Sequence, residues 1–252
     1  MTVTDVNVVK SAIFERPDDA NKGTLGSLLC VCGSYGMAGA AVMSAKGALR
    51  TGIGLAKCAL PRSIYPIVAQ TILESVYYPL SENADGRISK VNVPFLVSES
   101  CKSSATLVGC GLGVCDDTLK IVFSLIENST TPLVLDADAL NCVAKQPEIL
   151  LRKKAPIIIT PHPGEMSRLT GLATPLVNAE RERVALDFAQ KYGVVTVLKG
   201  AGTVIASPNG KVLVNPTGNS GMATGGSGDV LAGMTASILA QGASPFSSAA
   251  AA

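Results

Sequence analysis

The sequence predicts a three-layer α/β fold in which a mainly parallel sheet is covered by helices on both faces. The first observation is that short apolar runs alternate with segments of helical pattern along the chain. The second is composition: 47% of the 252 residues are hydrophobic and 16% are charged, which is typical of a globular protein with a large core. The third is that no linker, repeat or low-complexity tract divides the chain, so we expect a single domain over residues 1–252.

The strands are expected where short runs are rich in Val, Ile and Leu. Six such runs cover residues 27–33, 53–60, 106–111, 132–138, 156–160 and 194–200. Weaker extended runs cover residues 71–78, 203–207 and 211–215. The last two are separated by Pro-Asn-Gly, which predicts a hairpin turn.

The helices are expected between these strands. Four helical patterns cover residues 38–52, 116–128, 178–193 and 229–242. Three of them end at a glycine, and the second carries Asp116 and Asp117 in its first turn, where acids suit the helix dipole. The segment 244–252 begins like a helix and stops with the chain, so we expect the C-terminal end of the domain to be truncated.

Charge and cysteine content exclude several function classes. A net charge of +2, with no Trp and 4% aromatic residues, gives no general attraction to nucleic acid or to a membrane surface. The N-terminus has no signal-peptide pattern, and we expect a cytoplasmic protein. Seven cysteines and a single histidine, without a CxxC pair, do not suit a zinc site. Buried free thiols in a reducing compartment are expected; a catalytic thiol is the alternative.

Candidate site residues follow the expected strands. In open α/β sheets, ligands bind beyond the carboxyl ends of the strands. The segments found there are rich in glycine and polar residues, and they cover residues 33–39, 109–113, 136–141, 160–165, 199–203 and 218–229. Neither a GxxxxGK[ST] loop nor a GxGxxG fingerprint occurs, which disfavours the common phosphate-loop and dinucleotide-binding folds.

The last of these segments holds five glycines within eleven residues and leads to Gly228 and Asp229, directly before an apolar helix. Glycines let the N–H groups at a helix N-terminus approach a phosphate closely. One interpretation of Asp229 is a helix N-cap. The other is a carboxylate beside an anion site, which can deprotonate a hydroxyl that attacks a phosphoryl group held there.

Three other segments leave two interpretations each. Asp136, Asp138 and Asn141 form either a turn with a capping Asp, or contacts to a polar substrate or to magnesium through water. His162, held between two prolines, is either a structural residue or a ligand contact, and Glu165 could simply favour a helix dipole. Lys199, in "KGAGT", is either an exposed turn residue or a phosphate contact.

Six motifs in this order resemble the ribokinase-like superfamily and, within it, the NAD(P)H-hydrate dehydratase family. They are "KGTLGSLLCVCGSYGMAGAA", "VGCGLG", "VLDADALN", "TPHPGEMSRLTG", "VLKGAGTVI" and "GGSGDVLAG", and they extend over nearly the whole chain. Ser227 replaces the threonine that is usual in the last motif and retains its hydroxyl. The resemblance implies a ribokinase-like fold and the repair of NADHX and NADPHX, the hydrated forms of NADH and NADPH.

The resemblance also implies the chemistry. The ring hydroxyl of the hydrate is phosphorylated at the expense of ADP or ATP, with Mg²⁺ as cofactor, and phosphate then leaves. Asp229 is the catalytic base by this resemblance, and it also contacts the substrate. The other implied substrate contacts are Ala40, for which Ala41 is the alternative alignment, Gly113 and His162. The implied nucleotide contacts are Lys199, Gly200, Ala201, Gly202, Thr203 and Gly228. No residue is implied as a metal ligand.

The resemblance further implies a homotetramer and a functional partner, an NAD(P)H-hydrate epimerase, whose domain is often fused to this one and is absent from the sequence. This chain should therefore act on one epimer, the S form. ADP is the expected nucleotide, with ATP as the alternative. Two rival functions stay open: a small-molecule kinase of the same superfamily, acting on a vitamin precursor, and a non-catalytic nucleotide sensor.

Overall fold

The computed structural model describes residues 6–13 and 15–252. In this part of the chain, nine strands form one sheet in the order β3-β2-β1-β4-β5-β6-β7-β8-β9. Neighbours from β3 to β7 pair in parallel, and β8 and β9 are antiparallel to their neighbours. The strands are β1 Ser27–Val31, β2 Leu55–Pro61, β3 Val76–Leu80, β4 Ala105–Val108, β5 Leu133–Leu135, β6 Ile157–Ile159, β7 Val195–Leu198, β8 Thr203–Ala206 and β9 Val212–Asn215.

Every expected run overlaps a strand, and the predicted hairpin between β8 and β9 is confirmed. The central strands end earlier than expected because their last residues leave the sheet. After β5, the backbone turns at Ala137, whose φ of 49° lies in the left-handed region. The run at 71–78 becomes a strand only from Val76, since its first residue, Thr71, ends a helix.

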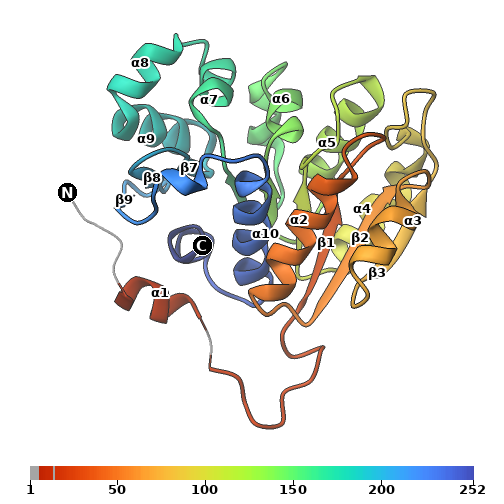
Figure 1. Cartoon of the computed structure of the whole chain (residues 1–252). Helices are drawn as coiled ribbons and strands as arrows, with labels where there is room; N and C mark the ends of the chain where they lie inside the picture. Colours follow the sequence, from red (N-terminus) through yellow and green to blue (C-terminus); the bar gives the residue numbers. More distant parts are fainter. Residues whose placement is uncertain (1–5, 14) are drawn as a thin grey trace.

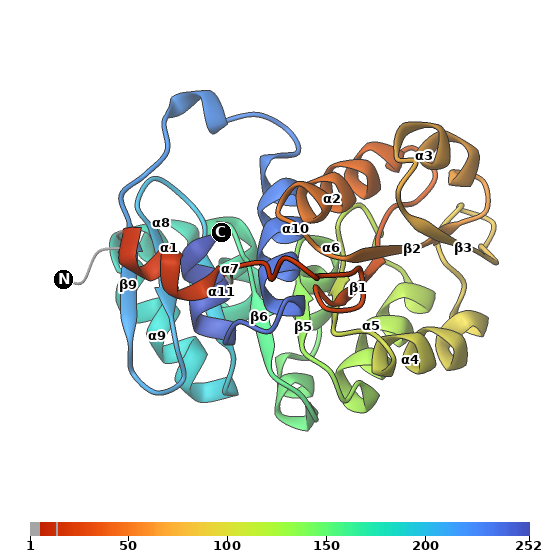
Figure 2. The same ribbon diagram turned by 90° about the horizontal axis from the view of Figure 1, so that it is seen from below.

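Helices cover both faces of the sheet, as predicted (Figures 1 and 2). One face carries α2 Ala38–Arg50, α3 Tyr65–Thr71, α10 Ser227–Ala240 and α11 Pro245–Ala251. The other carries α4 Val93–Cys101, α5 Asp116–Asn128, α6 Asp138–Val143, α7 Pro163–Thr170, α8 Thr174–Ala179 and α9 Arg181–Tyr192. α1 Val6–Ala12 lies beside α11, and short 3₁₀ helices cover Lys90–Asn92, Pro147–Arg152 and Ser220–Met222.

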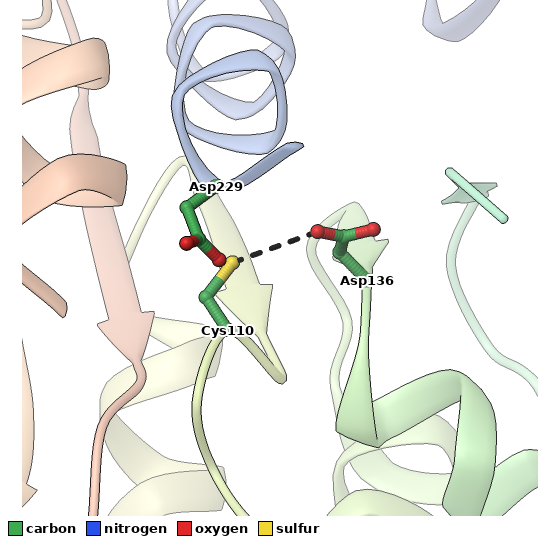
Figure 3. A group of neighbouring side chains, drawn as sticks. All are labelled: Cys110, Asp136 and Asp229. Carbon is green, nitrogen blue, oxygen red and sulfur yellow. Dashed lines mark hydrogen bonds between the residues drawn. The ribbon is translucent and has the colours of Figure 1, made fainter. Parts of the chain in front are cut away.

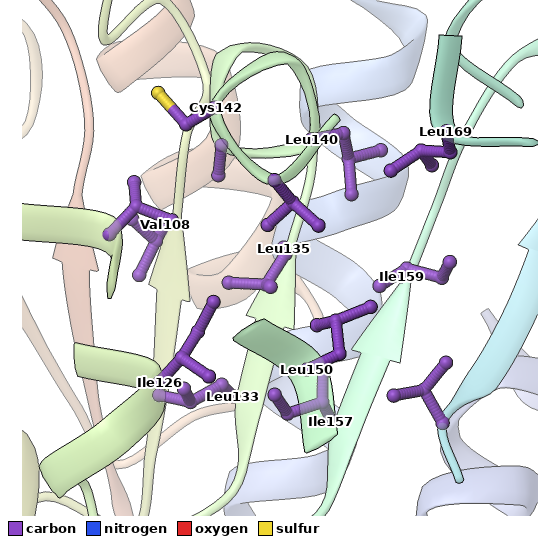
Figure 4. Close-up of a cluster of buried hydrophobic side chains, with 14 of the residues drawn as sticks. Val108, Ile126, Leu133, Leu135, Leu140, Cys142, Leu150, Ile157, Ile159 and Leu169 are labelled. Atoms are coloured by element: carbon purple, nitrogen blue, oxygen red, sulfur yellow. The ribbon is translucent and has the colours of Figure 1, made fainter. Parts of the chain in front are cut away.

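The core is divided between the two faces by the alternation of side chains along each strand. Leu133 and Leu135 of β5, with Ile157 and Ile159 of β6, pack under the α4–α9 layer (Figure 4). Their neighbours Val134 and Ile158 point to the other face, under α10 and α11. Because both faces are buried, these strands read as continuous apolar runs in the sequence.

The described residues contain six helices that the sequence did not predict. They are α1, α3, α4, α6, α7 and α8. Each has six to nine residues, too few for a helical pattern to stand out against the apolar runs beside it. No helix among residues 6–13 and 15–252 is long and apolar enough to cross a membrane.

Candidate active site

An ion pair between Asp136 and Lys199 lies at the carboxyl edge of the sheet. Asp136 and Thr160 directly follow the paired ends of β5 and β6, and Lys199 directly follows β7. Lys199 Nζ lies 2.6 Å from Asp136 Oδ1, and Thr160 Oγ1 donates to the same oxygen at 2.7 Å. Asp136 is 1% exposed and the Lys199 side chain 18%. The interpretations of Lys199 as an exposed turn residue and of Asp136 as a helix cap are therefore wrong.

Electrostatics keep this lysine charged. Burial lowers the pKa of Lys199, but the charges of Asp136 and Glu165 outweigh it, and the net pKa is raised. Its ammonium group also lies close to the N-terminus of α10: a Cβ added at Gly228 would be 3.4 Å from Lys199 Nζ. Lys199 thus joins the sheet edge to the glycine-rich segment.

His162 is the N-cap of α7. Its Nδ1 accepts hydrogen bonds from the amides of Gly164 (3.0 Å) and Glu165 (3.3 Å), and Glu165 Oε2 accepts from the His162 amide at 2.8 Å. This is a capping box with a histidine in place of the usual serine or threonine. Nδ1 of the imidazole thus caps the helix, while the His162 side chain remains 51% exposed. Glu165 lies in the first turn of α7, where an acid suits the helix dipole as expected, but it is buried, and burial, the largest cause, raises its pKa.

Asp229 lies in the first turn of α10 but does not cap it. The helix begins at Ser227, the N-cap is Gly226 with φ 93°, and no side chain caps the helix. The N-cap interpretation of Asp229 is therefore wrong, because the helix starts two residues earlier than the sequence pattern indicates. The first amides of α10 lack partners within the helix, and five of the eleven residues at positions 218–228 are glycines. Uncapped helix amides and a carboxylate thus occur within one turn.

Cys110, Asp136 and Asp229 gather beneath this turn (Figure 3). The Cys110 sulfur and one carboxylate oxygen of each aspartate all lie within 4.8 Å of one another. Cys110 Sγ lies 3.8 Å from Asp136 Oδ2. Burial and the charge of Asp136 raise the pKa of Asp229, whereas contacts with Cys110 and Lys199 lower it, and the net pKa is raised. The carboxylate of Asp229 therefore has a raised proton affinity.

The loop 109–113 contains Gly113, one of the expected substrate residues. It is bordered by Asp138 and Asn141 and by the other expected substrate residue, Ala40. The Gly113 amide donates to Asp138 Oδ2 at 2.8 Å. Asn141 Nδ2 donates to Asp138 Oδ1 at 3.3 Å. Ala40 is buried in the first turns of α2, and a Cβ added at Gly111 would be 2.7 Å from its methyl group. Asp138 is the first residue of α6, and the N-cap, Ala137, makes no side-chain hydrogen bond, so a capping Asp is wrong here too.

The segment from Lys199 to Thr203 forms a tight loop between β7 and β8. Gly200 and Gly202 have φ of 152° and 69°, and the Thr203 hydroxyl donates to the Gly200 carbonyl at 3.0 Å. Arg181 supports the loop by donating from Nη2 to the carbonyls of Leu198 (2.7 Å) and Gly202 (3.4 Å). Ala201, Gly202 and Arg181 line an open hollow of about 690 Å³.

The structure brings some of the expected residues together and separates others. Lys199, Gly228 and Asp229 share one centre, and Glu165 connects His162 to it, since its Oε2 lies 4.0 Å from Lys199 Nζ. Ala201 and Gly202 face the separate hollow. Sequence reasoning missed three contributors: the Thr160 hydroxyl, the Cys110 thiol and the Arg181 guanidinium. The first two had a signal, because both follow strand ends; Arg181 had none, because it comes from a helix start.

The seven cysteines are all unpaired, and five of them are buried. Cys101 and Cys115 are half-buried, so the expectation of buried thiols holds for the others only.

The comparisons with known proteins agree with this geometry. A sequence profile of the NAD(P)H-hydrate dehydratase family matches residues 28–252. The chain belongs to that family. It is 36% identical over 237 residues to the ADP-dependent (S)-NAD(P)H-hydrate dehydratase of Neisseria meningitidis, covering 93% of this chain and 76% of that protein. It is 39% identical over 236 residues to the bifunctional NAD(P)H-hydrate repair enzyme Nnr of Moorella thermoacetica.

The match to the Moorella protein covers 94% of this chain but only 44% of that protein, so this NAD(P)H-hydrate dehydratase family member spans less than half of the length of such relatives. Among solved structures, it is similar to the ADP/ATP-dependent NAD(P)H-hydrate dehydratase of Bacillus subtilis co-crystallised with ATP and Mg²⁺. The TM-score is 0.84 at 30% identity, covering 99% of this chain and 85% of that one. The ribokinase-like fold predicted from the motifs is confirmed.

Proposed function

We propose that this chain dehydrates the S epimer of NADHX and NADPHX, with ADP as the preferred phosphoryl donor and ATP as the alternative. The observation that carries the proposal is the position of Asp229, a base of raised pKa one residue from Gly228 at the uncapped N-terminus of α10. Base and anion site thus lie within one helical turn, as a phosphoryl transfer to a hydroxyl requires.

In the proposed first step, Asp229 accepts the proton of the ring hydroxyl. The hydroxyl oxygen bonds to the terminal phosphorus of the nucleotide as the bond from that phosphorus to the bridging oxygen breaks. The amides around Gly228 and the ammonium of Lys199 stabilise the charge of the transferring group. ADP would leave as AMP, and ATP as ADP.

In the proposed second step, the ring C–O bond breaks and phosphate leaves with the electron pair. Loss of a proton from the neighbouring ring carbon restores the double bond and hence NADH or NADPH. Phosphate is a far better leaving group than hydroxide, so nucleotide cleavage supplies the driving force. Asp229, Ala40, Gly113 and His162 would contact the hydrate in this scheme.

The nucleotide would contact residues 199–203 and Gly228. The hollow beside Ala201 and Gly202 supports this assignment, because it lies along the loop that leads to Lys199. Arg181 holds the carbonyls on both sides of the loop, so the loop is fixed before any ligand binds.

Magnesium would accompany the nucleotide. The cluster of Cys110, Asp136 and Asp229 does not fit as a protein cage for it, because Asp136 Oδ1 is already occupied by Lys199 and Thr160 and a thiol is a poor ligand for a hard cation. Mg²⁺ usually keeps several waters and binds through substrate phosphates. We therefore assign no residue as a metal ligand.

The test is an assay of the purified chain with racemic NADH hydrate, Mg²⁺, and ADP, ATP or no nucleotide. The absorbance of the reduced nicotinamide should return with ADP, stop when half of the hydrate is consumed, and resume when an NAD(P)H-hydrate epimerase is added. NADPH hydrate should behave alike. Accumulation of a stable phosphorylated product would indicate a kinase, and nucleotide binding without turnover a sensor.

The assembly and location proposed for the chain are a homotetramer in the cytoplasm, with the epimerase as functional partner. Light scattering of the purified chain tests the assembly: a monomeric mass at the assay concentration would exclude the tetramer.

A further inference from the structure

We propose that Cys110 is a positioning residue of this site: its buried thiol donates a hydrogen bond where Asp136 and Asp229 face each other, and it favours the ionised form of Asp229. The inference rests on the proposed role of Asp229 as base. It concerns a residue that the family resemblance leaves without a role, and it follows from the geometry in Figure 3.

The two oxygens of Asp136 have different partners. Oδ1 accepts from Lys199 Nζ at 2.6 Å and from Thr160 Oγ1 at 2.7 Å. The partner of Oδ2 is the Cys110 thiol, at 3.8 Å. The Cys110 sulfur and one carboxylate oxygen of each aspartate lie within 4.8 Å of one another, and Figure 3 shows the Asp136 oxygen bonded to the thiol on the side of Asp229. The thiol therefore lies between the carboxylates of Asp136 and Asp229, and it can donate its proton to one or the other.

The backbone fixes the sulfur in this place. Cys110 is fully buried and is flanked by Gly109 and Gly111, with φ of 124° and 62°. A Cβ at Gly109 would lie 2.0 Å from the Asp136 carbonyl, so only glycine lets the backbone segments at Gly109 and Asp136 come this close. The Cys110 carbonyl accepts from the Gly33 amide at 2.8 Å. These contacts fix the backbone on both sides of the buried thiol.

The thiol acts as a donor because it stays protonated. Its hydrogen bond with Cys32 and its burial raise the pKa of Cys110 well above the usual range. A thiol that does not ionise at neutral pH is neither a nucleophile nor a good metal ligand. It is a weak hydrogen-bond donor, and donation to a carboxylate favours the ionised form of that carboxylate.

The other charged groups around Asp229 do not replace this donor. Asp136 after β5 and Asp138 at the start of α6 both favour its protonated form. Lys199 opposes them, but its ammonium is already bonded to Asp136. The face of α2 that packs against α10 brings Ser44 and Gly47, which carry no charge. Among the groups that shift the pKa of Asp229, Cys110 is the uncharged hydrogen-bond donor.

The test compares the pKa of Asp229 in the wild type, Cys110→Ala, Cys110→Ser and Cys58→Ala. The last variant removes an equally buried thiol from β2, away from Asp136 and Asp229. The carboxyl resonance of Asp229, labelled with ¹³C and assigned by its loss in Asp229→Asn, reports the pKa directly. We expect Cys110→Ala to raise the midpoint by about one pH unit, and Cys110→Ser and Cys58→Ala to leave it within a few tenths.

The pH profile of kcat/KM for the hydrate is the second readout. Its acid limb should move upward with the carboxyl midpoint in Cys110→Ala and not in Cys58→Ala. A folded Cys110→Ala with an unmoved Asp229 midpoint would overturn the inference. A moved midpoint without any turnover of the hydrate by the wild type would uphold the role of Cys110 and reject the proposed function.

Discussion

Lys199 Nζ lies 2.6 Å from Asp136 Oδ1, and this contact joins the ends of β7 and β5 across the intervening strand β6. Lys199→Met leaves Asp136 charged and buried, with Thr160 as its remaining donor to Oδ1. We expect the free energy of unfolding to fall by about 3–5 kcal/mol, because an unpaired buried charge is costly. Urea unfolding measures the loss.

The matched control for this prediction is the double variant Lys199→Met/Asp136→Asn, which removes both charges and should recover most of the stability. The pKa of Lys199 is higher in the folded chain than in the unfolded chain. The stability that the pair contributes is therefore complete below the pKa of lysine in the unfolded chain, and it is lost only as the pH rises through the raised pKa of the folded chain. It should therefore not change between pH 6 and pH 8. A loss below 1 kcal/mol for Lys199→Met would contradict a buried pair.

The position of Asp229 depends on a close approach of α10 to α2. A Cβ added at Gly233 would lie 2.0 Å from the Ser44 carbonyl, so Gly233→Ala must push the helices apart. We expect a loss of about 1–3 kcal/mol and a lower kcat. Gly39→Ala is the control, because that helical glycine of α2 has open space at its Cβ and the change should stabilise by about 0.5–1 kcal/mol. Equal melting temperatures for the two variants would refute the packing argument.

His162 combines a structural and a proposed ligand role, and two substitutions separate them. His162→Ala removes both the N-cap of α7 and the imidazole, whereas His162→Asn keeps a good N-cap. Both should weaken hydrate binding more than ADP binding, but only His162→Ala should cost about 1 kcal/mol of stability. Calorimetric titrations with each ligand alone and thermal melts measure this. If His162→Asn binds the hydrate as the wild type does, the role is structural only.

Arg181 is expected to preorganise the nucleotide loop. Arg181→Met removes the donors to the carbonyls of Leu198 and Gly202, and the KM for ADP should rise about tenfold, equivalent to roughly 1.4 kcal/mol. The KM for the hydrate should stay within about twofold. Arg152→Met is the control, because Arg152 forms an exposed ion pair with Glu127 and does not line the hollow beside Ala201 and Gly202. Similar effects on both substrates would point to general damage instead.

The sequence predicted the sheet well because its strands are buried on both faces and leave unbroken apolar runs. It also indicated segments that meet at the carboxyl edge of the sheet, since ligand residues of such sheets follow strand ends. It erred where a local pattern hides a tertiary contact. Asp229 looks like an N-cap until the start of α10 is known, and Lys199 looks exposed until β7 is placed two strands from Asp136.

The partners of these residues could not be predicted for the same reason. Cys110 and Asp136 are separated by 26 positions, and Lys199 and Asp136 by 63. Only the strand order brings them together, and a single sequence does not state that order. The helix cap made by His162 was hidden in another way, because histidine is not among the usual capping residues.

The central claim is that Asp229 is the base that activates the hydrate hydroxyl, and Asp229→Asn tests it most directly. Asn keeps the size of the side chain and removes a carboxylate whose pKa is raised by burial and by Asp136, so the melting temperature should be unchanged or higher. ADP affinity should be unchanged or improved. We predict that turnover of the hydrate falls by roughly 10²–10⁴-fold or more. A stable variant that binds ADP and turns over within a few-fold of the wild type would contradict the account.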